Sequence, residues 1–203
     1  MIGFPAWYTV YTMTNESSRD RIFRAVRELF DEEGEAGISM RRIANIVGVT
    51  PMAIYKHYAD KDALVNALML DGFTAWEERV AGIATDDPRD WLLRLGDAFL
   101  DFALSEPRRY EAAFLLNASQ ARRFPDDFAA GRSPAAAQAQ QRIERVRRRD
   151  PGAASSTDIV LVLAALCQGM VSLYRAGRFT SEADFRDAFR RAIAHCIASY
   201  TSE

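Results

Sequence analysis

The chain has 203 residues, a net charge of −2 and 49% hydrophobic residues, which is ordinary for a water-soluble globular protein. Its longest apolar run, residues 159–167, is too short to cross a bilayer. The two cysteines, Cys167 and Cys196, lie in apolar helical patterns without metal-ligand spacing, as reduced core residues do. We therefore expect a cytoplasmic protein without a membrane span, an export signal or a metal site.

Residues 1–12 are apolar and aromatic and contain no lysine or arginine. This composition argues against a signal peptide and against a basic arm for the minor groove of DNA. We interpret residues 1–13 as an N-terminal extension in which Met13 is the native start. The alternative is a functional arm whose aromatic side chains are covered by the protein's own body or by a partner.

Helical periodicity begins at residues 17–33. Ser17 and Asp20 have the spacing of a capping box, and Gly34 and Gly37 end the pattern. Two short helix patterns and the start of a third helix follow within residues 38–68. Because helices this short are not stable alone, we expect them to pack against the first helix.

Individual residues set the turn between the two short patterns. Ser39 is expected to cap the first helix with its hydroxyl, and Gly48 ends that helix because it can adopt the left-handed conformation. Thr50 caps the second helix, in which Ile54 points inward and the other residues up to 58 face outward. Asp60 caps the third helix. This order of elements is that of a helix-turn-helix reader of the DNA major groove.

Positive charge is concentrated in this segment, although the whole chain is slightly acidic. Between residues 39 and 61 there is one acid, Asp60, and the cations are Arg41, Arg42, Lys56 and Lys61. Cations so placed favour contact with DNA phosphates. The alternative for the two lysines is chance, in a chain whose other basic residues besides histidine are all arginine.

Four motifs of the segment resemble the N-terminal domain of the TetR family of bacterial transcriptional repressors: GISMRRIA (37–44), GVT (48–50), IYKHY (54–58) and KDAL (61–64). The resemblance runs without a gap over roughly residues 17–70. It implies an all-helical homodimer that binds a palindromic operator in double-stranded DNA. It also implies that the DNA is released when a small molecule enters the C-terminal domain.

The resemblance assigns contacts with phosphates or bases to one set of residues: Ser39, Met40, Arg41, Thr50, Pro51, Met52, Ala53, Tyr55, Lys56, His57 and Lys61. The sequence departs from the family where Pro51, Met52 and Ala53 offer few hydrogen-bonding groups. Base recognition would then depend on apolar contact with thymine methyl groups, on Arg41 or Arg42, and on DNA shape.

The rest of the chain is predicted to be helical to its end. Helix patterns cover residues 60–84, 88–105, a shorter stretch from Pro107, 134–149, 159–174 and 181–200, with breaks at 117–133 and 150–156. No strand pattern is present, so the predicted fold class is all-α with about nine helices. A three-helix DNA-binding domain at residues 14–60 would precede a larger helical bundle at residues 61–203, which binds the ligand and dimerises.

An arginine cluster ends the helix predicted at residues 134–149, and its members are Arg142, Arg145, Arg147, Arg148 and Arg149. One interpretation is a second nucleic-acid patch. We favour the alternative, in which the cations complement the free carbonyl groups at the C-terminus of the helix.

The last two helices, residues 157–177 and 181–200, are interpreted as the interface of a homodimer. Residues 159–174 are apolar on nearly every side, and Gly169 is small enough for another helix to approach closely. The last helix carries an apolar stripe opposite its arginines. Two such helices paired about a twofold axis make a four-helix interface, which sets the spacing of the DNA half-sites.

The resemblance also places a ligand cavity in the bundle. Its candidate wall consists of aromatic residues on the surrounding helices: Phe73, Trp76, Phe99, Phe102, Tyr110 and Phe114. Gln168 and Ser172 are candidate polar groups, because a buried polar side chain needs a partner that a ligand could supply. Core packing is the alternative for each aromatic residue, and a hydrogen bond across subunits is the alternative for the polar ones. A cavity of this kind predicts a hydrophobic or amphiphilic effector.

Two rival classes of function are an all-helical enzyme and a constitutive architectural DNA-binding protein without a ligand. The only histidines, His57 and His195, have no Ser-His-Asp set or metal-spaced ligands around them, so we assign no catalytic residue and no cofactor. A fully packed bundle would favour the architectural protein. An apolar cavity would favour the ligand-responsive regulator.

Overall fold

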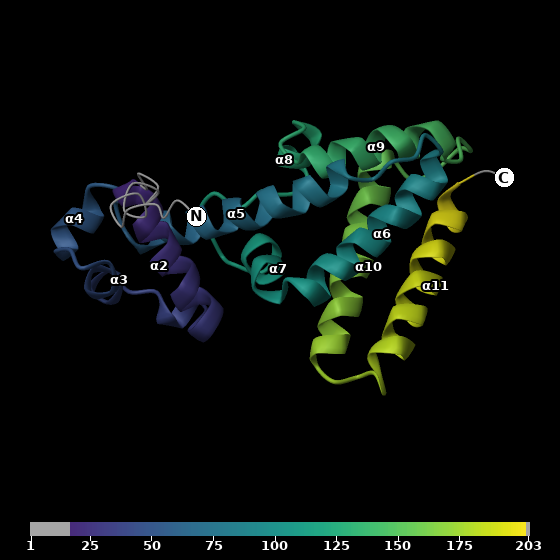
Figure 1. Cartoon of the computed structure of the whole chain (residues 1–203). Coiled ribbons are helices and arrows are strands. Elements are labelled where there is room, and N and C mark those ends of the chain that lie inside the picture. The colour runs from purple at the N-terminus through teal and green to yellow at the C-terminus, as the bar shows by residue number, and fades with distance from the viewer. Residues whose placement is uncertain (1–16, 202–203) are drawn as a thin grey trace, which may run out of the picture. The chain divides into compact units, whose positions relative to one another are not determined.

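The computed structural model describes residues 17–201 (Figure 1). The expectations for the N-terminal extension and for Met13 lie outside the described residues. Within the described part, the chain forms ten α-helices and one short 3-10 helix, and the only β-type pairing is a single bridge between Arg147 and Thr201. The prediction of an all-α fold is confirmed.

The chain divides into two compact units, one up to Leu68 and one from Met69 onward. The division falls inside a long helix, α5 (Lys61–Ala81), so the first turns of this helix belong to the first unit. The predicted domain boundary between residues 60 and 61 lies at the N-terminus of α5, whereas the two compact units divide between Leu68 and Met69.

The first unit begins with α2 (Ser18–Glu33) and the 3-10 helix η1 (Gly34–Gly37). The predicted capping box is confirmed, because the Ser17 hydroxyl accepts from the Asp20 amide at 3.2 Å and the Asp20 carboxylate accepts from the Ser17 amide at 3.3 Å. The apolar face of α2 is nearly fully buried. Hydrophobic burial of this face stabilises a unit whose next two helices are short.

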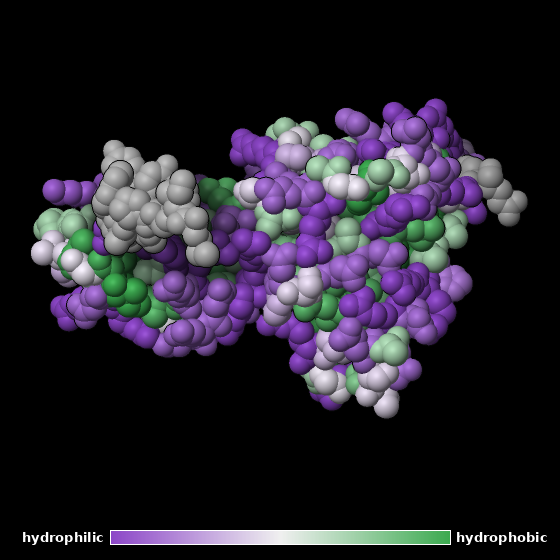
Figure 2. Space-filling view, in the orientation of Figure 1, coloured by the Kyte–Doolittle hydropathy of each residue, from purple (hydrophilic) through white to green (hydrophobic). Residues whose placement is uncertain are grey.

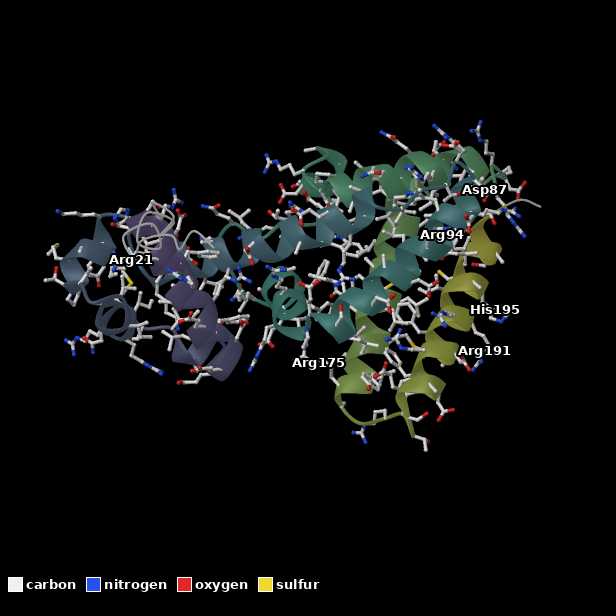
Figure 3. The ribbon with its side chains drawn as sticks, viewed as in Figure 1. Arg21, Asp87, Arg94, Arg175, Arg191 and His195 are labelled. Carbon is white, nitrogen blue, oxygen red and sulfur yellow. The ribbon has the colours of Figure 1, made fainter. Side chains whose placement is uncertain are left out.

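The next helix, α3 (Met40–Val47), ends at Gly48, which has the left-handed conformation that the sequence predicted, with φ of +74°. Beyond it the Val49 amide donates to the Ala44 carbonyl at 2.9 Å. The guanidinium of Arg21, which is labelled in Figure 3, donates to the Val47 carbonyl at 2.9 Å. Ser39 occupies the N-cap position, but its side chain makes no capping hydrogen bond. The prediction of a hydroxyl cap at this residue is wrong.

The second short helix, α4 (Pro51–Tyr55), is capped as predicted by Thr50, whose hydroxyl accepts from the Ala53 amide at 3.3 Å. It ends earlier than expected, because the amides of residues 57 and 58 both turn back to the Ile54 carbonyl. Tyr58 was expected to face outward but is buried, and the guanidinium of Arg19 lies 5.4 Å from the centre of its ring. Asp60 then caps α5 by accepting from the Ala63 amide at 2.8 Å.

The second unit contains the rest of α5 and six further helices: α6 (Pro88–Ser105), α7 (Pro107–Phe114), α8 (Asp126–Ala129), α9 (Pro134–Val146), α10 (Ser156–Arg175) and α11 (Glu182–Tyr200). Helices α6, α10 and α11 lie side by side (Figure 1) and share a core in which Trp91, Phe102 and Phe185 are fully buried. Ion pairs from Arg186 to Asp101 and from Arg190 to Asp97, each 2.7 Å long, join α11 to α6.

Helix α8 lies in the segment that was expected to be an irregular break. Asp127 holds it in place, because its carboxylate accepts from the Arg123 amide at 2.6 Å and from the Arg132 guanidinium at 2.7 Å. A helix of four residues is too short to leave a periodic signal in the sequence.

The arginine cluster at the end of α9 makes contacts within the protein. Arg147 pairs with Glu144 at 2.7 Å, Arg149 donates to the Glu144 carbonyl at 3.2 Å, and Arg148 donates to the Thr201 carbonyl at 3.2 Å. The guanidinium of Arg142 lies 4.0 Å from the centre of the Trp91 ring. These contacts support the structural interpretation of the cluster over a second nucleic-acid patch.

Helix α10 is, by length and composition, the one helix among the described residues that could cross a membrane. The apolar run of residues 159–167 is too short to cross a bilayer, but the helix that contains it extends from Ser156 to Arg175. One side of α10 packs on α6, α9 and α11, whereas Leu161, Val162 and Leu173 are exposed. Elsewhere the face in view of the second unit is mostly hydrophilic, with smaller hydrophobic areas (Figure 2).

Candidate nucleic-acid interface and ligand cavity

Helix α4 and the turn after it present the outward-facing residues of the helix-turn-helix. Met52 is 69% exposed, and the side chains of Pro51, Tyr55, Lys56 and His57 are also exposed, whereas Ile54 is fully buried beneath them. Large apolar side chains in this position can contact thymine methyl groups in the major groove. The exposed surface of α4 therefore combines apolar groups with a cation.

The other predicted DNA contacts on α3, in the turn and on α4 have mixed surroundings. Arg41 is exposed on α3, and Ser39, Met40 and Ala53 are half-buried. The hydroxyl oxygen of Thr50 serves as a helix cap, but its O–H remains a donor. Each of these residues stays a predicted DNA contact.

Two of the cations are engaged with carboxylates inside the first unit. The guanidinium of Arg42 donates to both carboxylate oxygens of Glu33, which lowers the pKa of Glu33 and raises the pKa of Arg42. The ammonium of Lys61 donates to the Glu35 carbonyl at 3.1 Å and lies 3.9 Å from the Glu35 carboxylate. A phosphate contact by Lys61 would therefore compete with Glu35.

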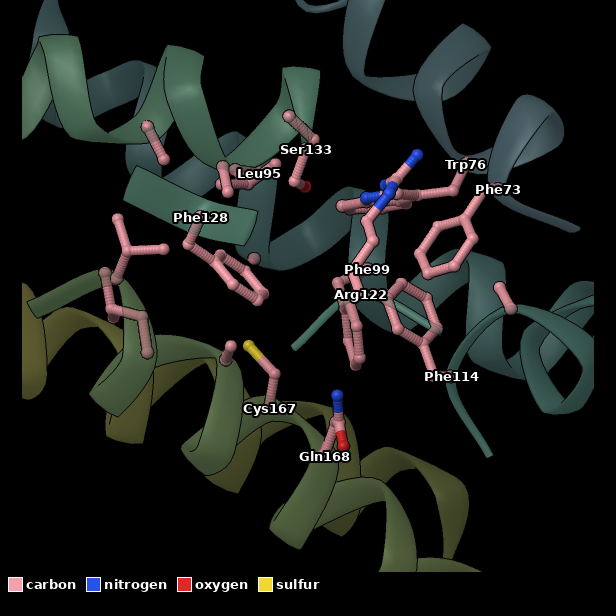
Figure 4. A pocket seen from close by; sticks show the side chains of 18 of the residues that line it. Phe73, Trp76, Leu95, Phe99, Phe114, Arg122, Phe128, Ser133, Cys167 and Gln168 are labelled. Carbon is pink, nitrogen blue, oxygen red and sulfur yellow. The ribbon is translucent and has the colours of Figure 1, made fainter. Parts of the chain in front are cut away.

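The second unit contains a cavity of about 260 Å³ (Figure 4). Five residues that the sequence nominated line it together: Phe73, Trp76, Phe99, Phe114 and Gln168. The aromatic rings contact one another, with centroids 5.5 Å apart for Phe73 and Phe114 and 5.6 Å apart for Trp76 and Phe99. Such an apolar, aromatic wall with few polar groups is typical of sites for small organic molecules.

Three nominated residues do not line this cavity. Phe102 is fully buried in the core beside Trp76, with ring centroids 5.9 Å apart. Tyr110 is buried behind the wall, edge-on to Phe99 at 5.6 Å. Ser172 is exposed on the outer side of α10. The two aromatic residues thus support the wall from behind, and Ser172 belongs to another surface.

Several lining residues were missed by the sequence analysis. Arg122 follows α7, Phe128 lies on α8 and Ser133 precedes α9, so all three come from the segment that lacked periodicity. Cys167 lies on α10 next to Gln168, and Leu95 lies on α6. A segment without regular periodicity gives no indication of which side chains face inward.

Burial affects two ionisable groups near the cavity. It raises the pKa of the Cys167 thiol to about 12 and the pKa of the Tyr110 hydroxyl to about 12. Desolvation disfavours the charged form of each group. Both side chains are therefore neutral at physiological pH, and Cys167 contributes an unreactive, apolar surface to the cavity.

The raised pKa of Cys167 predicts an alkaline loss of stability. The neutral thiol stabilises the folded state fully below its unfolded pKa of 9.0, and this stabilisation is lost as the pH rises towards about 12. Above pH 9, the free energy of unfolding of the wild type should fall more steeply than that of Cys167→Ala, by at most about 1.4 kcal/mol per pH unit. Urea titrations followed by circular dichroism measure both slopes. Equal slopes would contradict the burial of this thiol.

No arrangement suited to metal binding is found among residues 17–201. No group of three or more His, Cys, Asp or Glu side chains could hold a metal ion there. Both histidines are exposed, and His195 points away from the helical bundle on α11, as does Arg191 (Figure 3).

Two family models match the chain. The model described as bacterial regulatory proteins, tetR family, matches residues 22–68, and the model described as tetracyclin repressor-like, C-terminal domain, matches residues 92–196. The first match covers the helix-turn-helix, and the second covers most of the helices around the cavity.

Individual relatives agree with these matches over part of their length. The chain is 33% identical over 95 residues to the uncharacterised HTH-type transcriptional regulator YobS of Bacillus subtilis, and 36% identical over 55 residues to the HTH-type transcriptional regulator UidR of Escherichia coli. These matches cover 46% and 27% of this chain. The chain spans only 50% of the length of the first relative and 28% of the second.

Solved structures share the fold over nearly the whole chain. A protein of unknown function from Rhodococcus sp. RHA1 superposes with a TM-score of 0.71 at 22% identity, covering 94% of this chain and 99% of that one. A TetR variant from Acinetobacter baumannii AYE in complex with minocycline superposes with a TM-score of 0.62 at 20% identity, covering 90% and 95%. At these identities the likeness shows the fold alone.

Proposed function

Because the chain belongs to the TetR family of bacterial transcriptional regulators, we propose that it represses transcription as a homodimer on a palindromic operator and is released by a small hydrophobic molecule. DNA binding through the helix-turn-helix and the absence of enzymatic activity are properties of the family. The observation that carries the proposed ligand response is the aromatic cavity in the second unit. A regulator of bacterial transcription would act in the cytoplasm, where the chromosome lies.

The cavity favours a ligand-responsive regulator over an architectural DNA-binding protein. An architectural protein has no need of unfilled apolar space, because a cavity lowers the stability of the fold. The related TetR variant from Acinetobacter is in complex with minocycline, which supports a small organic molecule as the ligand of this fold.

We propose a homodimer through residues 157–177 and 181–200, and the outer face of α10 supports the first of these two segments. Between Asp158 and Arg175, which are exposed and charged, the exposed residues of the helix are apolar or small: Leu161, Val162, Ala165, Gly169, Ser172 and Leu173. A continuous exposed apolar strip is typical of a protein interface, and small residues allow two helices to approach closely. A second copy of the same helix about a twofold axis would bury this strip.

Release from DNA then needs only a change in geometry. Two recognition helices bind two half-sites at once only if the dimer holds them at the correct spacing. A ligand that binds the DNA-incompetent dimer more tightly shifts the population away from the operator. By linkage, the effector must bind free dimer more tightly than operator-bound dimer, by the factor by which it weakens DNA binding.

Selection of bound duplexes from a random DNA pool tests the proposed function. We expect the purified protein to enrich a palindromic site with a fixed half-site spacing. Bound duplex should be released when an effector of the cavity is added. Enrichment of sequences without twofold symmetry would contradict the proposed dimeric repressor, and enrichment without release by any cavity ligand would favour the architectural alternative.

Lys61→Ala tests the assignment of phosphate contacts. If Lys61 contacts a phosphate, the variant should bind operator and non-operator DNA more weakly. The slope of log affinity against log salt should also become less steep, by about 0.9 for each phosphate that the protein no longer neutralises. Met52→Ala should instead change sequence preference, because Met52 is proposed to contact bases. Fluorescence anisotropy at several salt concentrations measures both effects.

Glu35→Gln is the matched control for this prediction. It removes the carboxylate that lies 3.9 Å from the Lys61 ammonium and leaves the lysine in place. The variant should bind DNA at least as tightly as the wild type, with an unchanged salt slope. An unchanged slope in Lys61→Ala would show that Lys61 does not contact a phosphate.

A further inference from the structure

The lining of the cavity carries a single full charge. Among its 23 residues, Arg122 is the only one of the Asp, Glu, Lys, Arg and His types. The remaining polar side chains of note are the amide of Gln168 and the hydroxyl of Ser133. A ligand in this cavity therefore meets one positive charge and no lining carboxylate.

Arg122 is held in place but incompletely paired. Its side chain is 20% exposed, its guanidinium carbon lies 4.2 Å from the centre of the Phe73 ring, and one nitrogen donates to the Glu77 carboxylate at 3.2 Å. A guanidinium has five N–H donors. Within residues 17–201, the hydrogen bond to Glu77 is the one hydrogen bond that the Arg122 guanidinium makes. The other donors are free to bind a ligand.

We propose that the effector is an organic anion of the carboxylate type, whose charged group binds Arg122 while its apolar part lies against the aromatic wall. This inference rests on the proposed role of the cavity as the effector site. A carboxylate pairs with guanidinium through strong, charge-assisted hydrogen bonds, often two in parallel. A cationic ligand would be repelled by Arg122. A neutral apolar ligand would bury the N–H groups of Arg122 without offering them acceptors.

The dimensions of the cavity define the rest of the molecule. A volume of about 260 Å³ admits an organic molecule of roughly a dozen non-hydrogen atoms. Figure 4 shows Arg122 among Phe73, Trp76 and Phe99, while Gln168 approaches from α10. The ligand would thus have one anionic end, a short apolar or aromatic body and space for one further hydrogen bond.

Glu77 gives the bound anion a competitor. It lies on α5, is 30% exposed and does not line the cavity. An incoming carboxylate would share or replace Glu77 as the partner of Arg122, and so change a contact of α5. The first turns of this same helix belong to the DNA-binding unit. Anion binding at Arg122 would therefore alter the contacts of a helix whose first turns belong to the DNA-binding unit.

Calorimetry with matched probes tests the charge of the effector. The panel consists of phenylbutanoate, naphthylacetate and decanoate, each compared with its primary amide and with the corresponding amine, added to the full chain. At least one acid should bind about ten-fold or more tightly than its amide, and the amines should not bind. Equal binding of acid and amide, or preference for an amine, would overturn the proposal. Binding of no compound would contradict the effector site itself.

Variants of the ion pair separate recognition from folding. Arg122→Gln should weaken binding of the acid by about ten- to a hundred-fold and leave the amide unaffected, whereas Arg123→Gln, an exposed neighbour outside the lining, should change neither. Glu77→Gln should strengthen binding of the acid, a gain that misfolding cannot produce. Retention of the acid preference in Arg122→Gln would overturn the assignment.

Discussion

Gly169→Arg is expected to convert the proposed dimer into monomers and to remove nearly all specific affinity for the operator. Gly169 lies on the exposed side of α10, and a Cβ atom built there meets nothing within 4 Å inside the subunit. The subunit should therefore fold normally with arginine at this position. At a close helix approach between two subunits, however, the long charged side chain would clash and lose its hydration.

Loss of the dimer should affect DNA binding far more than subunit stability. A single recognition helix contacts few base pairs, so operator affinity should fall towards the level of nonspecific binding, on the order of a thousand-fold or more. Sedimentation and operator titration measure the two effects, and a thermal melt checks the fold. Gly169→Ala, which adds a single methyl group, is the conservative control. A Gly169→Arg variant that still sediments as a dimer would place the interface elsewhere.

Gln168→Leu is expected to leave operator affinity unchanged but to require about ten-fold more effector for release, the usual cost of removing one hydrogen bond to a ligand. Gln168 lines the cavity, whereas Ser172, one turn further along α10, is exposed and outside it. Ser172→Ala is therefore the matched control and should respond to effector as the wild type does.

Release of operator, titrated with the panel compound that binds the wild type most tightly, measures this effect. A rightward shift of the titration for Gln168→Leu alone would support a polar anchor in the cavity. An unchanged response combined with weaker dimerisation would instead show that Gln168 serves the subunit interface.

Helix ends were predictable because their signals are local. Ser17, Thr50 and Asp60 each accept a hydrogen bond from the amide three residues ahead, as N-cap residues do, and Gly48 has the left-handed backbone that ends α3. Ser39 looked equivalent in sequence but does not cap. A capping residue is necessary for such a hydrogen bond, yet the side-chain rotamer that forms it depends on neighbours distant in the chain.

The cavity was only partly predictable, for two physical reasons. A helix that is apolar on nearly every side has no single apolar face that shows which side packs inward. The sequence therefore could not show that Gln168 faces the cavity while Ser172 faces outward. The segment after α7 has no period at all, and it supplies Arg122, which carries the charge of the lining. The residue that matters most for ligand chemistry was thus the one with the weakest signal.

The exposed apolar strip of α10 makes the fate of a newly synthesised subunit depend on its concentration. Before it meets a partner, each copy presents a helix that resembles a membrane-spanning segment in length and composition. In the proposed dimer, mass action favours assembly when the protein is abundant, whereas at low abundance more copies stay monomeric and leave the strip open to proteases. A regulator that dimerises through this strip should have a lower limit of cellular abundance, below which copies are destroyed faster than they pair.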